Sequence, residues 1–205
     1  MNIISRVFPY HHFRISNKAI KILTLSDTLF FSGMALVEII FGVFIVQNIP
    51  GATVVELGIG HSIFLVGIVL TEPLFSKFYD SAKNLESSYY GFVIGNLLKS
   101  VMRLLFIVID SVPMFYIVYF IMGIIHSIEY PSFAKLFTKH LDSGRESSEW
   151  GYKDSLMSTG KVLTTFLSGY IVVSLGYQFL FLLSSLIMLI FGVLTPLYYK
   201  KEILG

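Results

Sequence analysis

The residues of this sequence that could do chemistry are ionisable side chains placed inside long apolar stretches. Asp27 and Glu38 are the only charged residues between positions 23 and 49, and they lie 11 residues apart. Because 11 residues make about three turns of an α-helix, both carboxylates lie on one helix face. Carboxylates are costly in hydrocarbon, so this face should turn toward other helices or a water-filled cavity. There a carboxylate could bind and release a proton, or it could belong to a structural ion pair. For Asp27, near the cytoplasmic end of the span, we favour solvation at the membrane interface.

Lys99 and Arg103 form a second cluster, four residues apart on one face of a later apolar stretch. A dibasic face inside a membrane span could bind an anionic substrate. It could also hold Glu38 as one half of a proton switch, with Lys99 or Arg103 as the partner. A fixed ion pair that orders helix packing explains the same residues equally well, so both alternatives stay open.

His126 and Glu129 form a third cluster, three residues apart on one helix face. Histidine titrates near neutral pH and a carboxylate can orient it, so the pair could relay a proton. A hydrogen-bonded polar patch against the next span is the structural alternative. No third ligand stands at a recognisable spacing, so we expect no metal site and no cofactor. By depth in the membrane, Glu129 or Asp27 could pair with Lys161.

The composition sets the class of protein. Of the 205 residues, 55% are hydrophobic and only 14% are charged, and the mean hydropathy is +0.75. Soluble domains carry about 25% charged residues, so this is an integral membrane composition. The absence of cysteine excludes disulfides and thiolate chemistry. Ser62 follows His61 but lacks a G-x-S-x-G context, so we do not expect an enzyme.

Long apolar runs between helix-breaking residues predict an all-α, polytopic membrane protein. A helix of about 20 apolar residues crosses the bilayer core, and the runs are interrupted at Pro50-Gly51, at Asp110–Pro113 and at Gly176. A basic segment at 1–22 precedes the spans and a tail at 199–205 follows them. The six expected spans are about 23–48, 54–76, 89–109, 113–137, 153–175 and 177–198.

The basic residues predict the orientation of the spans. Twelve of the 15 Lys and Arg residues fall in the two terminal segments and in the connections after spans 2 and 4. The three opposite connections contain none. Basic loops stay in the cytoplasm, so we expect both termini to be cytoplasmic in a cell (plasma or inner) membrane. The residues do not gather in one patch, so no nucleic acid partner is expected. The adjacent His11 and His12 do not share a helix face and predict no metal site.

Several of these segments carry motifs that resemble those of major facilitator superfamily transporters. The turn Ser76-Lys77-Phe78-Tyr79-Asp80, followed by Lys83, is similar to the family signature G-x-x-x-D-x-x-G-R-R. Span 4 contains Gly123 and then Pro131. Span 5 contains Gly160-x-x-x-Thr164-Thr165-x-x-Ser168-Gly169, which keeps the spacing of the antiporter motif G-x-x-x-G-P-x-x-G-G with small residues at most positions. The resemblance makes four residues candidates for gating or packing: Asp80, Pro131, Gly160 and Gly169.

The resemblance covers about residues 20–198 and implies the N-terminal six-helix half of such a transporter. In that family two halves face each other across a central cavity, lined by helices 1 and 4 of each half. This implies transport of a small solute by alternating access, with proton coupling left open. It places four acidic or histidine side chains in or near the cavity: Asp27, Glu38, His126 and Glu129.

The length allows three ways to complete the cavity. Only one half is present, so the resemblance implies a parallel homodimer, a separately encoded second half or a truncated chain. A non-transporting membrane scaffold, or a subunit of a larger membrane complex, is the alternative function. The missing half and the incomplete turn motif favour that alternative.

Overall fold

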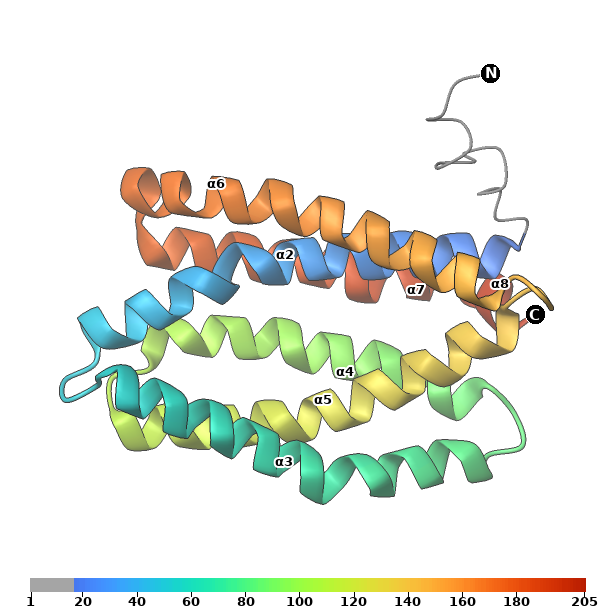
Figure 1. Cartoon of the computed structure of the whole chain (residues 1–205), viewed down its shortest axis with the longest axis horizontal. Coiled ribbons are helices and arrows are strands. Elements are labelled where there is room, and N and C mark those ends of the chain that lie inside the picture. Colours follow the sequence, from blue (N-terminus) through green and yellow to red (C-terminus); the bar gives the residue numbers. More distant parts are fainter. Residues whose placement is uncertain (1–16) are drawn as a thin grey trace.

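Helices account for nearly all of the part of the chain that the computed structural model describes, residues 17–205, and this part contains no strand (Figure 1). Residues 1–16, with His11, His12 and most of the expected basic segment, lie outside the described residues. The α-helices are α2 (Lys18–Asn48), α3 (Val54–Ser81), α4 (Glu86–Leu105), α5 (Val112–His140), α6 (Glu146–Leu189), α7 (Thr195–Tyr198) and α8 (Lys200–Leu204).

Five helical segments of the described chain are long and apolar enough to cross a membrane. The last of them runs over Glu146–Tyr198, and Gly176 interrupts it with a φ of 82° and a ψ of 169°. This left-handed backbone is open to glycine at little cost. The chain turns back at Gly176, as the sequence predicted, and divides α6 into a first arm (146–175) and a second arm (177–189) (Figure 1).

Two helices begin earlier than the apolar runs indicated. Helix α2 begins at Lys18, because the side chain of Asn17 accepts the backbone N–H of Ala19 at 2.8 Å and caps the first turn. Helix α6 begins at Glu146 rather than near residue 153, and its first turns pack through Trp150, whose ring centroid lies 4.6 Å from that of Phe137. Hydropathy marks where a helix enters hydrocarbon, and both helices extend beyond that level.

The helices form two layers (Figure 1). Helix α2 packs along both arms of α6, α3 packs along α5, and α4 bridges the layers by contacting α5 and α6. Small residues allow the close crossings. A Cβ on Gly67 would lie 2.8 Å from the carbonyl oxygen of Phe120, and a Cβ on Gly33 would lie 2.8 Å from the side chain of Ile187. The α3–α5 and α2–α6 crossings therefore depend on glycine.

A π-helical segment, Ile190–Leu194, continues the second arm of α6. Wide π turns leave carbonyl groups in need of partners. The hydroxyl of Ser26 donates to the carbonyl of Phe191 at 2.6 Å, and the amide of Asn96 donates to the carbonyl of Gly192 at 3.0 Å. These two polar side chains attach α2 and α4 to the end of the second arm.

The apolar core is divided into two clusters. One contains residues from the end of α2, the 3-10 turn Phe106–Val108 after α4 and the start of α5, such as Phe41, Phe106 and Phe115. The other contains residues from the start of α2 and the end of α5, such as Leu23 and Phe137. Along α2, α4 and α5, the buried Asp27, Lys99 and Glu129 lie between these clusters, whereas the buried Arg103 lies beside Met102 and Phe106 of the first cluster.

Candidate functional site

Four buried charged side chains form two ion pairs between the apolar clusters, and we call them the ionic layer. Asp27 of α2 pairs with Lys153 of the first arm of α6, with Nζ of Lys153 2.8 Å from Oδ2 of Asp27. Lys99 of α4 donates to the carboxylate of Glu129 of α5. None of the four is more than 7% exposed. The charge of Asp27 also interacts with those of Glu129 and Lys99, so the two pairs act on one another.

Lys153 is the member of the ionic layer that the sequence did not identify. It was counted with the basic connection before span 5, and Lys161 was named instead as a possible partner of Asp27 or Glu129. Because α6 begins at Glu146, Lys153 already lies inside the bundle. Its ammonium lies 4.9 Å from the ring centroid of Phe133 and 5.4 Å from that of Trp150, where cation–π attraction adds to the ion pair.

Lys161 lies away from both acids, and its Nζ is 5.0 Å from the ring centroid of Phe31. A signal for the correct partner was available: Lys153 precedes Lys161 by eight residues and therefore shares its helix face.

The Lys99–Glu129 pair differs from the pairs considered from the sequence, in which Glu38 could meet either Lys99 or Arg103. Gly95 lies one turn before Lys99, and a Cβ on it would lie 2.9 Å from the Cα of Glu129. The backbones of α4 and α5 therefore approach most closely beside Glu129, and its carboxylate meets Lys99 rather than reaching the cavity. The Gly91-x-x-x-Gly95 spacing, typical of close packing, was the sequence signal for this contact.

His126 does not join Glu129 in a hydrogen bond within the described chain. Its half-buried ring stacks on Tyr130 with centroids 5.4 Å apart, and it meets the edge of Phe64 of α3 at 6.0 Å. Glu129 points inward to Lys99, while His126 points toward α3. The expected relay is therefore not assembled, although the ring remains within the electrostatic influence of Glu129 and Lys99.

Arg103 is buried without a partner among residues 17–205. It is 6% exposed, its Nε is fully buried, and none of its nitrogens makes a hydrogen bond or ion pair there. The guanidinium carbon lies 5.1 Å from the ring centroid of Phe106. Glu38 and Tyr119 are near enough to act on its charge. Glu38 is exposed and is also unpaired in this part of the chain.

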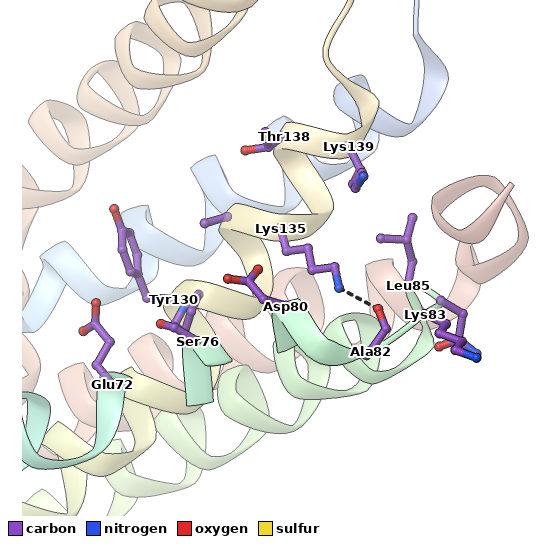
Figure 2. A pocket seen from close by; sticks show the side chains of 13 residues that line it. Glu72, Ser76, Asp80, Ala82, Lys83, Leu85, Tyr130, Lys135, Thr138 and Lys139 are labelled. Atoms are coloured by element: carbon purple, nitrogen blue, oxygen red, sulfur yellow. Dashed lines mark hydrogen bonds between the residues drawn. The ribbon is translucent and has the colours of Figure 1, made fainter. Parts of the chain in front are cut away.

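A groove of about 900 Å³ lies at the end of α3, between that helix and α5 (Figure 2). Lys135 of α5 donates to the carbonyl groups of Tyr79 and Ala82 and caps the end of α3. The lysine reaches across to Ala82 in Figure 2, with Asp80 beside it. The groove is lined by Glu72, Ser76, Asp80, Ala82, Lys83, Asn84, Leu85, Tyr130, Pro131, Ala134, Lys135, Thr138 and Lys139.

The turn that carries Asp80 is held from two sides. Besides the cap from Lys135, the hydroxyl of Tyr79 donates to the carbonyl of Ile128 at 2.9 Å. Tyr79 also packs against Gly91 of α4. Asp80 is exposed, and both it and Pro131 line the groove rather than the bundle interior.

The two glycines named for gating or packing occupy different surroundings. A Cβ on Gly160 would clash with the hydroxyl of Ser32, so this glycine lies at the contact between the first arm of α6 and α2. Gly169 has open space around it and lies on an outward face with Phe166, Tyr170 and Val173. It therefore makes no close approach within the described chain.

A search for metal sites and comparisons with known proteins also bear on function. No group of three or more His, Asp or Glu side chains within residues 17–205 could hold a metal ion. A family model described as the Major Facilitator Superfamily matches residues 23–203. No curated protein and no solved structure matches the chain.

Proposed function

Because the chain belongs to the Major Facilitator Superfamily, we propose that it forms one six-helix half of a solute transporter. Membership and the long apolar helices make it a multi-pass membrane protein of a transporter family. Counting the two arms of α6 separately gives six crossings. The distribution of basic residues supports the proposal that both termini lie in the cytoplasm and that the protein resides in the cell membrane.

One observation supports the pairing of two halves: some ionisable side chains within the apolar helices are not buried by the rest of the chain. Glu38 is exposed on α2, and Lys161 is only partly buried on the first arm of α6. Lys161 lies over Phe31, which is seven residues before Glu38 and so on the same face of α2. Such charges are costly against lipid. A second half would convert this face into the wall of a water-filled cavity.

The outer surface of the bundle supports the same arrangement. Only 11% of the apolar stretch of α3 is buried within the chain. Large apolar side chains such as Val69 and Leu74 are exposed along it, as Val162 and Phe166 are on the first arm of α6. These faces suit lipid or a second half. A second copy of the chain is the partner that we propose, and a separately encoded half is the alternative source.

Proton coupling, as we propose it, uses Glu38 and Arg103. Lys99 already pairs with Glu129, which leaves Arg103 as the cation for the Glu38 carboxylate. Protonation of Glu38 would remove the anion that balances Arg103. The pair could then be made and lost during alternating access, while the ionic layer stays closed.

A second candidate is a membrane scaffold or a subunit that moves no solute. The ionic layer favours it, because one buried ion pair joins α2 to the first arm of α6 and the other joins α4 to α5. A scaffold needs such fixed contacts, whereas a transporter must keep some contact that changes.

The test combines mass and transport. The protein mass of the purified particle in nanodiscs should be twice the 23.2 kDa of one chain. In sealed vesicles a pH gradient should drive solute uptake, and Glu38→Gln should remove the dependence on the gradient without loss of the pair. A monomer that moves no solute would instead support the scaffold, and unchanged coupling in Glu38→Gln would remove the role of Glu38.

A further inference from the structure

Arg103 differs from the buried charges of the ionic layer in having no opposite charge in contact. A guanidinium carries five N–H donors and stays charged. Burial of a charge without a partner is costly. Nevertheless Arg103 is 6% exposed and none of its donors is used within residues 17–205. Only Nε is fully buried without a partner, so the two terminal nitrogens keep some accessible surface.

Aromatic rings hold the guanidinium in place. Phe106 lies beneath it with the guanidinium carbon 5.1 Å from the ring centroid. Phe106 stacks on Phe41 of α2 at 3.9 Å, and Phe41 lies nearly parallel to Tyr119 of α5 at 5.8 Å. The hydroxyl of Tyr119 also makes no hydrogen bond among the described residues. Arg103 and Tyr119 thus present unused donors in the same region.

Glu38 is the nearby anion, but it does not occupy this region. It lies one turn before Phe41 on α2 and acts on the charge of Arg103 from a distance. It is exposed and makes no ion pair in the described chain. No carboxylate of the described chain therefore bonds to the guanidinium of Arg103.

We propose that Arg103 binds the anionic group of the transported solute, a small carboxylate or phosphate. The inference rests on the proposed transport function and names its substrate class. The planar guanidinium matches an oxyanion with two parallel hydrogen bonds, and the Tyr119 hydroxyl supplies a further donor. A neutral or cationic solute would leave the buried cation unbalanced. Glu38 competes with the solute for the same positive charge.

Binding of simple oxyanions to the full chain in nanodiscs tests the proposal. The probes are acetate, succinate and inorganic phosphate, with glycerol and choline as neutral and cationic controls, at fixed pH and ionic strength. Isothermal titration should show saturable binding of at least one oxyanion and none of choline. Arg103→Gln should weaken that binding by at least tenfold. Arg103→Lys should weaken it less, because lysine keeps the positive charge but cannot form the two parallel hydrogen bonds of a guanidinium.

Two further variants sharpen the result. Glu38→Gln should bind the oxyanion at least as tightly as the unaltered protein, because the competing carboxylate is gone. Lys77→Gln removes an exposed cation of α3 and should leave binding within twofold. If Arg103→Gln does not fold, the oxyanion titration of the unaltered chain and the Arg103→Lys variant decide.

The outcomes separate the substrate class from transport itself. Equal oxyanion binding in Arg103→Gln and the unaltered protein would overturn the proposal. Absence of oxyanion binding together with uptake of glycerol or choline would also overturn it, while transport would stand. Saturable binding at Arg103 without uptake of any solute would keep the anion site and reject the transporter.

Discussion

Removing one partner of the Asp27–Lys153 ion pair should destabilise the protein more than removing both. The two side chains are 2% and 8% exposed, and their charged atoms are 2.8 Å apart. A charge left alone at such a site costs about 3–5 kcal/mol, whereas exchange of a whole buried pair for apolar residues is often neutral. Asp27→Leu and Lys153→Met should therefore each lower the free energy of unfolding by about 3–5 kcal/mol, and the double variant by less than either.

The surroundings decide which single variant loses more. Lys153→Met removes the cation–π contacts with Phe133 and Trp150. Such a contact stabilises a protein by about 0.5 kcal/mol when it is exposed and by about 2 kcal/mol when it is buried. It also leaves a carboxylate alone in an apolar layer. Asp27→Leu leaves an ammonium that still lies over both rings and 3.5 Å from Oδ1 of Asp154. Lys153→Met should thus be the more destabilising of the two.

The single tryptophan of the chain gives a local assay. Trp150 lies 5.4 Å from Nζ of Lys153, so its fluorescence should follow the loss of this contact during unfolding in mixed micelles with dodecyl sulfate. The matched control is the Lys18–Glu202 pair, with a distance of 3.0 Å but side chains 67% and 29% exposed. Its removal should cost only about 0–1 kcal/mol. Losses that simply add in the Asp27/Lys153 double variant would refute the reasoning.

Three other perturbations have defined outcomes. Gly123→Ala would press a Cβ against the backbone of α3 and should lower the melting temperature by several degrees, whereas Gly58→Ala, with open space around it, should be neutral or slightly stabilising in a thermal unfolding series. Lys135→Met frees two carbonyl groups at the end of α3 and should cost about 1–3 kcal/mol, seen as faster hydrogen exchange there. The hydrogen bond and the charge of the Lys18 ammonium lower the pKa of Glu202, so the small contribution of this pair to holding α8 on α2 should be complete above the ordinary carboxylate range and be lost as the pH falls through the lowered pKa. Exchange of the α8 amides should rise slightly in that window, and in Glu202→Gln at each pH where Glu202 is otherwise ionised.

Local chemistry explains which parts of the fold could be predicted from the sequence. Length and hydropathy predicted the long apolar helices, because membrane thickness sets both. Gly176 predicted the reversal within α6, since its φ of 82° suits glycine. Helix starts at Lys18 and Glu146 were not predicted, because capping and aromatic packing rather than hydropathy determine them.

The ion pairs could not be predicted, because the depth of a residue in the membrane does not specify how its helix is rotated about its own axis, and therefore which neighbouring helix the residue faces. By depth, Glu38 could pair with Lys99 or with Arg103, but Gly95 allows α5 to pack against α4, and Lys99 pairs with Glu129. In the same way, the early start of α6 places Lys153 inside the bundle, where it pairs with Asp27. Both outcomes depend on which neighbour each helix face packs against, and small residues at the crossing were the available signal.

The two levels of buried charge differ in what they can do. Charges of the ionic layer are matched and nearly inaccessible, so separating either pair would leave an isolated ion inside the bundle. Arg103 has no such bond to break, and Glu38 is exposed and unpaired in the described chain. If a residue exchanges ion-pair partners during transport, the free-energy cost of breaking its first pair must be small. Arg103 and Glu38 satisfy that condition, whereas Lys99 and Asp27 do not, so variants of the ionic layer should change stability and variants of Arg103 and Glu38 should change binding and coupling.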